Sequence, residues 1–452
     1  MGRKILLSFL PLFFCILCFS TAVAQEREYY KQAELPNDVH YLPAPPDTSD
    51  LLFAADFNRW IWGKSLRGTP RGEQASWESL FATERMATVF GEAMGITITK
   101  EGTPALWNFM RRAGHTGSNA VRSAKKYYMR VRPFARMNEH VASEFDDEAG
   151  LRKNGSYPSG HTPLGWATAL ALAEMLPELQ DTILRRGFEY GESRVIVGAH
   201  WQSDVDAGRL ASSVAFARMH RHSDYAKDLA AARAEYLKLR PSVAPKTTSY
   251  PDATRILDAP VTAGSPFYYG DVAAYWQSKA ERGTARGQQA IDDADGSLTT
   301  LLRNFSEASG LKLSVTATPK TAALLAWAEE ILLMEAEKLK QATFRERPYV
   351  RFNEPTLIPD EEEASKGTSS YPSASATLGW GLALLLIEVV PDHSEQILKY
   401  GFEYGYSRVI AGYHFASDVQ AGRVLAACVL CRMHNDPDFR KRFEEAKSEW
   451  GK

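Results

Sequence analysis

The sequence is poor in cysteine and lacks metal-binding spacings, and both shortages exclude classes of protein. It has only four cysteines, Cys15, Cys18, Cys428 and Cys431. The first two fall in an N-terminal leader, so the mature chain is not a disulfide-scaffolded protein. The other two lie three residues apart in an apolar run, which predicts a packing role on a buried helix. No Cys/His/Asp cluster has zinc spacing, so we expect neither a metal nor another cofactor.

An excess of charge of either sign is also missing. The formal net charge is −2, from 53 Lys and Arg against 55 Asp and Glu. Such a balance argues against a dominant nucleic-acid-binding surface, and no nucleic-acid partner is expected.

Apolar runs of membrane-spanning length are absent, and the N-terminal run at residues 5–19 follows Arg3 and Lys4. This run is short of the ~20 residues of a membrane span. The small-x-small pattern Ala22-Val23-Ala24 then predicts a signal peptide, residues 1–24, cleaved after Ala24. We therefore expect a periplasmic or secreted protein without an integral membrane segment, with an uncleaved anchor as the alternative.

An internal repeat organises the rest of the chain. Its offset is 214 or 215 residues, and it relates chemically similar positions: Lys125, Arg132, Pro158, Arg194, His200 and Asp204 recur as Lys340, Arg347, Pro372, Arg408, His414 and Asp418. Two tandem copies of one domain explain this pattern. We predict copy one at 25–240, a proline-rich linker at 241–266 and copy two at 267–452.

Each copy is expected to be all-α. The segments are rich in Ala, Leu, Glu and Arg, and the alternation typical of strands is scarce. The most apolar segments, Leu164–Leu176 and Leu378–Val390, each carry a glutamate and are too short to span a bilayer. They are predicted to be the central helices of two helical bundles.

The strongest chemical signal lies at residues 156–163, Ser-Tyr-Pro-Ser-Gly-His-Thr-Pro, which lead into the first apolar helix. The start of a helix offers unpaired N–H groups and the positive end of a dipole, and therefore suits an anion. Upstream lies Lys125-x6-Arg132-Pro133, and downstream lies Arg194-x5-His200-x3-Asp204. The three stretches together supply three cations, two histidines and a carboxylate to one anion site.

This three-part pattern resembles the signature of the phosphatidic acid phosphatase type 2 superfamily. The residues around it are similar to the class A bacterial acid phosphatases, in stretches 123–125, 128–134, 154–162 and 193–206. The resemblance implies the helical bundle of the phosphatidic acid phosphatase type 2 and vanadium haloperoxidase type. It also implies a metal-independent hydrolase of small phosphate monoesters, with His200 forming a phosphohistidine. His161 would then protonate the leaving oxygen and later activate water.

The cations have complementary expected roles. The seven-residue spacing would place Lys125 and Arg132 about two helical turns apart on one face. Arg132 and Arg194 can each bind phosphate oxygens in bidentate fashion, whereas Lys125 adds a point charge. Ser159 and Gly160 are expected to contribute hydroxyl and backbone N–H donors.

The predicted nucleophile has a predicted orienting group. His200 and Asp204 are four residues apart, which would place both on one helix face. A carboxylate there can accept the Nδ1–H of the imidazole and leave Nε2 as a directed lone pair.

Copy two departs from this pattern at two positions, because Ala374 and Ser375 stand where copy one has Gly160 and His161. The remaining residues predict a second, impaired phosphate site: Lys340, Arg347, Ser373, Arg408, His414 and Asp418. Loss of a general acid costs roughly 10²–10⁴ in rate. A purely structural role, with the copies packed together as a built-in dimer, is the alternative.

Two other functions fit the same anion site. One is a vanadate-dependent haloperoxidase, and the other is a phosphate-binding scaffold without turnover. The similarity outside the signature favours the phosphatase over the former, and the intact set of His161, His200 and Asp204 favours it over the latter. The natural substrate is not indicated by any motif.

Overall fold

The computed structural model describes residues 28–240 and 249–451. The predicted signal peptide lies outside the described residues, and so do the first residues of the predicted linker. Within these two ranges the regular elements are α-helices and short 3-10 helices, with no strand. The expected all-α fold is therefore confirmed.

Copy one contains twelve α-helices and two 3-10 helices within its described residues. In chain order they are η1 (Gln32–Glu34), α1 (Asp38–Tyr41), α2 (Phe53–Leu66), α3 (Pro70–Trp77), α4 (Thr83–Met94), α5 (Pro104–Asn119), α6 (Arg122–Tyr128), α7 (Pro133–Arg136), α8 (Glu148–Arg152), α9 (His161–Met175), η2 (Pro177–Leu179), α10 (Gln180–Ile196), α11 (Gln202–Met219) and α12 (Tyr225–Leu239).

The described part of the chain after residue 248 repeats this order with small changes. Its elements are α13 (Ala253–Ile256), α14 (Tyr268–Lys279), α15 (Ala285–Asp292), α16 (Leu298–Ser309), α17 (Pro319–Ala342), α18 (Pro348–Phe352), η3 (Pro359–Glu361), α19 (Glu362–Ser365), α20 (Ala374–Val389), α21 (Ser394–Ala411), α22 (Ala416–Met433) and α23 (Pro437–Glu449). α13 falls in the predicted linker and corresponds to α1 by the repeat offset.

The two most apolar helices lie at the centres of the copies. Every residue of α9 is buried, and α20 is buried from Ala376 to Val389. A helix that is apolar on all sides must be surrounded. α9 is enclosed by α5, α10 and α11, and α20 by α17, α21 and α22. Among the described residues, no helix combines the length and the apolar character that crossing a membrane requires. Cys428 and Cys431 are free and buried on α22, as expected.

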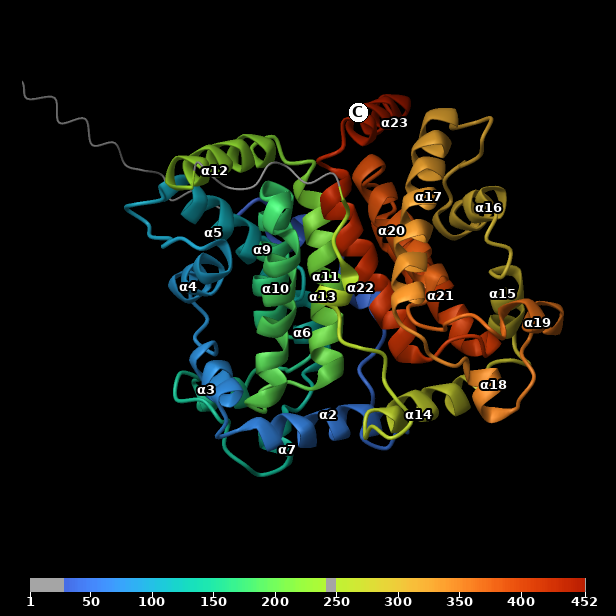
Figure 1. Cartoon of the computed structure of the whole chain (residues 1–452), viewed down its shortest axis with the longest axis horizontal. Coiled ribbons are helices and arrows are strands. Elements are labelled where there is room, and N and C mark those ends of the chain that lie inside the picture. The colour runs from blue at the N-terminus through green and yellow to red at the C-terminus, as the bar shows by residue number, and fades with distance from the viewer. Residues whose placement is uncertain (1–27, 241–248, 452) are drawn as a thin grey trace, which may run out of the picture.

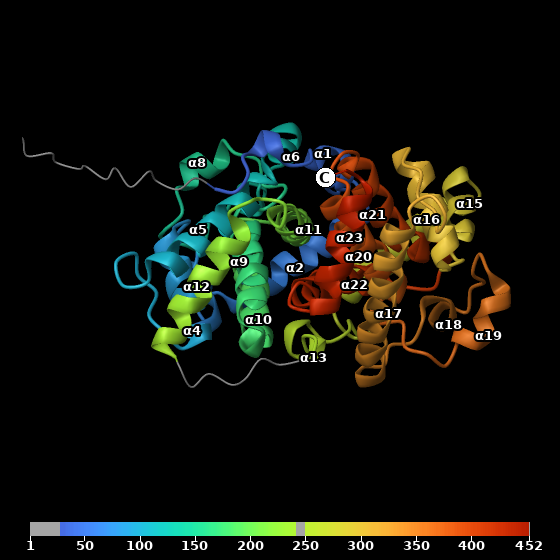
Figure 2. The same ribbon diagram turned by 90° about the horizontal axis from the view of Figure 1, so that it is seen from above.

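The two copies lie side by side, with copy one in blue to green and copy two in yellow to red (Figures 1 and 2). Their contacts are reciprocal: α9 touches α22, α11 touches α20, and α2 touches its repeat counterpart α14. At this interface the buried Trp380 Nε1 donates a hydrogen bond to Ser213 Oγ at 3.1 Å.

Short arms also cross between the copies. α1 contacts α21 of copy two, and its counterpart α13 contacts α10 of copy one. Each arm also accepts a hydrogen bond from an equivalent tyrosine. Tyr157 Oη donates to the Pro43 carbonyl, and Tyr371 Oη donates to the Asp258 carbonyl at 2.7 Å.

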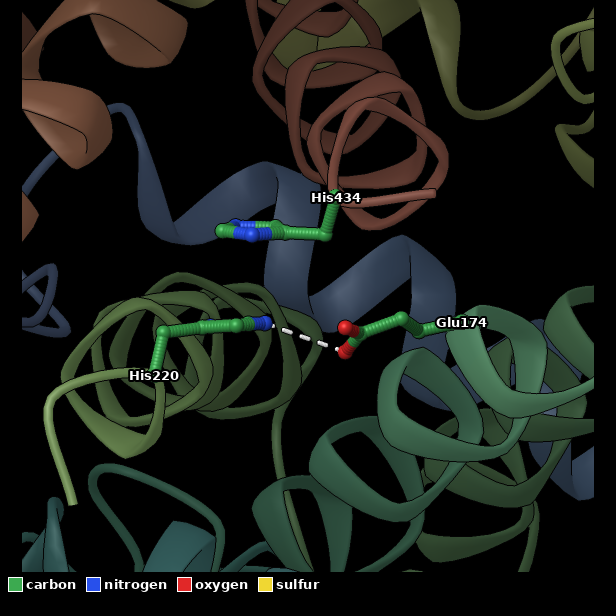
Figure 3. Close-up of side chains that lie close together, drawn as sticks. All are labelled: Glu174, His220 and His434. Atoms are coloured by element: carbon green, nitrogen blue, oxygen red, sulfur yellow. Dashed lines mark hydrogen bonds and ion pairs between the residues drawn. The ribbon is translucent and has the colours of Figure 1, made fainter. Parts of the chain in front are cut away.

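A pair of histidines related by the repeat meets at the interface. His220 and His434 stack with ring centroids 3.5 Å apart and 9° between the planes. Each ring contacts a buried glutamate of its own copy. His220 Nε2 is 3.0 Å from Glu174, a contact drawn in Figure 3, and His434 Nε2 is 3.2 Å from Glu388. The sequence related these histidines by the repeat but did not indicate that they touch.

Candidate active site

The predicted anion loop precedes the buried helix α9. Gly160 is the N-cap and the helix begins at His161, three residues before the predicted start at Leu164. Ser159 Oγ accepts from the Thr162 amide at 3.3 Å. A methyl group added at Gly160 would meet only Lys125 Cε, at 4.0 Å, so the side of this residue that faces Lys125 is open. The open space and the first-turn amides are together suited to an anion.

Lys125 and Arg132 converge on this loop, but not from one helical face. α6 ends at Tyr128, and Met129 takes a left-handed conformation with φ 42°. Arg132 is extended, with ψ 152°, because the following proline disfavours a helical conformation there, and it is the N-cap of α7. The predicted continuous two-turn spacing is therefore wrong, and the two cations meet because the chain turns between them.

Arg132 is buried and Lys125 is half-buried, and both cations are bonded to backbone carbonyls. Lys125 Nζ donates to the carbonyls of Gly155 and Ser156 at 3.0 and 3.3 Å. Arg132 donates to the carbonyl of Gly155 among others. Burial, reinforced by the charge of Arg132, lowers the pKa of Lys125 to about 7. Burial, reinforced by Arg194, lowers the pKa of Arg132 to about 10. Cations held this closely favour a bound anion.

Arg194, near the end of α10, is the cation with the most spare hydrogen-bonding capacity. It is 1% exposed, and its Nη2 donates to Asp146 Oδ1 at 2.9 Å. Within residues 28–240 and 249–451, its Nε and Nη1 have no hydrogen-bond partner. Two donors of one guanidinium are therefore free to bind the oxygens of an anion.

His200 faces Arg132 through its Nε2, which lies 3.0 Å from Arg132 Nη1. An arginine can only donate, so this nitrogen carries the lone pair and Nδ1 carries the proton. Burial first, and then the charges of Arg132 and Lys125, keep the pKa of His200 well below its usual range. A neutral imidazole with its lone pair among cations is arranged for nucleophilic attack on an anion.

Asp204 supports His200 in a way that the spacing did not predict. α11 begins at Gln202, so His200 precedes the helix and the two residues do not share a helical face. Asp204 Oδ2 accepts from the Trp201 amide at 2.8 Å and lies 3.4 Å from His200 Nδ1. The carboxylate therefore caps a helix N-terminus and holds its charge beside the imidazole.

His161 is held by residues that the sequence reasoning missed. Its Nε2 lies 2.8 Å from the carbonyl of Ser79, so Nε2 carries a proton and Nδ1 is the nitrogen that gains or loses the second one. The half-exposed Phe81 packs edge-on against this ring, with centroids 4.9 Å apart. Burial and then Arg194 lower the pKa of His161 well below its usual range. A turn between α3 and α4 supplies Ser79 and Phe81, and no motif marks it.

Copy two keeps the cationic side of the site. Lys340 Nζ donates to the carbonyl of Ser369 at 2.7 Å, and Arg347 Nη1 is 3.3 Å from His414 Nε2. His414 Nδ1 donates to the carbonyl of Ser370 at 2.7 Å, and burial lowers the pKa of His414 to about 3.

The other predicted residues of the second site are also present. Arg408 has a buried Nε without a partner in the described chain, and Ser373 Oγ accepts from the Ala376 amide. Asp418 is fully buried, accepts from the Phe415 amide at 2.9 Å and lies 3.9 Å from His414 Nδ1.

Copy two differs from copy one at His161 and at two residues that contact its ring. By the repeat offset, Ser79, Phe81 and His161 correspond to Ala294, Gly296 and Ser375. The register is secured by an equivalent contact, because Glu78 accepts from Ser193 Oγ as Asp293 accepts from Ser407 Oγ. Copy two thus lacks a counterpart both of His161 and of the aromatic ring beside it.

The interface cluster of Glu174, His220 and His434 is the group of possible metal ligands that the described residues bring together. Its geometry does not suit a shared ion. The parallel rings cannot direct two lone pairs at one point, as tetrahedral coordination requires. Glu174 is instead engaged by the hydroxyl of Tyr225 at 2.6 Å.

Comparison with known proteins agrees with this geometry. Residues 113–227 and 320–442 match the PAP2 (phosphatidic acid phosphatase type 2) superfamily. The two stretches make up more than half of the chain, one in each copy. The chain therefore belongs to the PAP2 superfamily, and the family resemblance seen in the sequence is confirmed.

Relatives within this superfamily carry phosphatase names. The chain is 44% identical over 213 residues to the non-specific acid phosphatase of Providencia stuartii, covering 47% of this chain and 86% of that protein. It is 42% identical over 236 residues to that of Salmonella typhimurium, covering 52% and 93%. It is 32% identical over 245 residues to an acid phosphatase of Zymomonas mobilis, covering 51% and 92%. These names agree with the predicted enzyme class, a phosphoric monoester hydrolase.

Proposed function

We propose that copy one is an acid phosphatase that hydrolyses small phosphate monoesters through a phosphohistidine at His200. The observation that carries the proposal is the position of His200 Nε2, 3.0 Å from Arg132, in a site where Arg194 has two open donors. In the first step Nε2 attacks phosphorus, the bond to the leaving oxygen breaks, and His161 gives that oxygen its proton. In the second step His161 takes a proton from water, which attacks phosphorus and releases the phosphate from His200.

Electrostatics support a mechanism that uses side chains instead of a metal. Lys125, Arg132 and Arg194 provide the positive charge that the phosphoryl oxygens need, and the start of α9 adds backbone donors. A bound phosphate brings negative charge that opposes the effect of Arg194 on His161. Substrate therefore favours the protonated form of His161 at the moment when an acid is needed.

We propose that copy two binds phosphate without hydrolysing alkyl esters. Its cations and His414 are arranged as in copy one, whereas Ser375 cannot protonate an alkoxide. The reciprocal arms and the α2–α14 contact support a permanent association of the copies, comparable to a built-in dimer. The boundaries 25–240, 241–266 and 267–452, and export by the residue 1–24 leader, belong to the same proposal.

A phosphomonoester panel tests the function. The wild type, His200→Ala and His414→Ala are assayed with aryl and alkyl phosphates in EDTA. We expect turnover of alkyl phosphates in the wild type and His414→Ala, and its loss in His200→Ala. Activity that disappears in EDTA, or alkyl phosphate hydrolysis that survives His200→Ala, would reject the mechanism. Halide oxidation with added vanadate, measured in parallel, tests the haloperoxidase alternative.

A further inference from the structure

The carboxylate of Asp204 is held from behind by a buried arginine. Arg130 Nη1 donates to Asp204 Oδ1 at 2.7 Å, on the oxygen that does not face His200. Asp204 is fully buried, and the Arg130 side chain is 9% exposed. Arg130 lies within the motif region, but the three-part signature assigns it no part.

A second carboxylate, from outside the stretches matched to the superfamily, fixes this arginine. Asp56 on α2 accepts from Arg130 Nη2 at 2.7 Å and is 1% exposed. The same carboxylate accepts from the amide and hydroxyl of Ser203, at 2.8 and 2.6 Å. Ser203 Oγ in turn accepts from Arg130 Nη1 at 2.8 Å. Asp56 thus sets the position of both the arginine and the residue before Asp204.

Copy two repeats the arrangement bond by bond. Arg345 donates to Asp418 and, at 2.6 Å, to Asp271. Asp271 accepts from the amide and hydroxyl of Ser417 at 2.9 and 2.6 Å. Two independent halves of the chain therefore bury the same set of charges, although a buried charge is costly unless it is paired.

We propose that Asp56 and Arg130 are positioning residues for His200, acting through Asp204. The proposal rests on the proposed function, in which His200 becomes positively charged when it carries the phosphoryl group. One arginine shared between two carboxylates leaves the cluster with a net negative charge, and that charge stabilises the developing imidazolium. Without the Asp56 charge, Arg130 would neutralise Asp204 alone and would no longer be held in place.

The location of Asp56 makes copy two part of this support. Its neighbour Ala55 packs against Gly270 so closely that a methyl group added at Gly270 would lie 2.5 Å from Ala55 Cβ. α2 and α14 therefore touch at Ala55 and Gly270, the residues that directly precede Asp56 and Asp271. Copy two, which lacks the acid histidine, therefore packs against α2, the helix of copy one that carries Asp56.

The test compares Asp56→Asn with its matched control Asp271→Asn. Each change removes one buried charge from equivalent partners, an arginine and a serine. Only Asp56→Asn does so in copy one, the copy that has His161. We expect Asp56→Asn to lower kcat by about 10-fold to 10²-fold with little change in KM, because Asp56 does not touch substrate. Asp271→Asn should lower the melting temperature comparably and leave kcat within about twofold of the wild type.

A milder pair covers the case in which either asparagine variant fails to fold. Ser203→Ala and Ser417→Ala each remove one hydroxyl from the equivalent clusters. We expect a fall in kcat, and in the rate of His200 phosphorylation, for Ser203→Ala alone. Equal effects of the two members of a pair on kcat, or none from the copy-one member, would overturn the proposal. Wild-type turnover and its loss in His200→Ala are measured first, so that failure of the proposed function is recognised separately.

Discussion

Arg194→Lys separates anion binding from folding more clearly than any other change in the site. Arg194 is 1% exposed, and its Nε and Nη1 have no partner in the described part of the chain. Both donors can therefore bind an oxyanion without first breaking a bond to the protein. A lysine keeps the charge but cannot reproduce the two-pronged contact.

The expected loss follows from the two open donors. A hydrogen bond to a charged group contributes about 1.5–3 kcal/mol, so losing two costs about 3–6 kcal/mol of transition-state binding. At 1.4 kcal/mol per tenfold, kcat/KM should fall by about 10²–10⁴. Vanadate at 100 times the wild-type Kd should stabilise the wild type by about 2.7 kcal/mol. A variant that binds 100-fold more weakly should gain only about 0.4 kcal/mol.

The assay combines steady-state kinetics with thermal unfolding in the presence and absence of vanadate. Arg209→Lys is the control, because Arg209 is 3% exposed and lies outside the site. It should change the melting temperature but not the stabilisation by vanadate. If Arg194→Lys keeps kcat/KM within about threefold and the full vanadate effect, Arg194 does not bind the phosphoryl group.

Three further predictions concern pH, copy two and the interface. The lowered pKa of His200 keeps this nucleophile neutral in acid, whereas His161 must be protonated to act as the acid. The plot of kcat against pH should therefore be bell-shaped with an optimum below neutrality, and a rate that rises through alkaline pH would contradict these roles. In a His200→Ala background, Ser375→His should raise hydrolysis of alkyl phosphates, and no gain would mean that copy two lacks more than an acid. Gly270→Ala should cost about 1–3 kcal/mol in urea unfolding by crowding Ala55, and an unchanged midpoint would contradict the close contact.

The sequence was sufficient for the architecture and for the residues that meet at the site. The repeat offset and the apolar segments predicted two helical copies with α9 and α20 at their centres, because a helix that is apolar on all sides has to be enclosed. The recurrence of charged and histidine residues at fixed offsets also predicted that Arg132, Arg194 and His200 belong to the site, because charged residues on a solvated surface are not expected to recur in this way.

Local conformation was harder to predict, because spacing alone does not say where a helix begins. The seven residues from Lys125 to Arg132 fit two helical turns, yet the left-handed Met129 ends the helix between them. The four residues from His200 to Asp204 also fit one turn, but Asp204 caps the helix and His200 precedes it. In both cases a turn or a helix cap lies between two residues whose spacing would also fit a continuous helix.

Contacts between distant segments carried no signal in a single sequence. Ser79 and Asp56 reach the site from 82 and 74 residues before their partners His161 and Arg130. Neither belongs to a recognisable motif, and only the packing of α2 and of the turn after α3 brings them in. The stacked pair of His220 and His434 was equally hidden, because the repeat shows equivalence but not the axis that relates the copies.

The most direct test of the central claim is to trap the phosphoryl group on the enzyme. A phosphate-labelled aryl monoester is mixed with His161→Ala, which can form the intermediate but lacks the base for its hydrolysis. After a rapid alkaline quench, the site of labelling is located by mass spectrometry. The account predicts an acid-labile phosphoryl group on His200, absent from His200→Ala at that position. Labelling of any other copy-one residue, or turnover without labelling of His200, would contradict it.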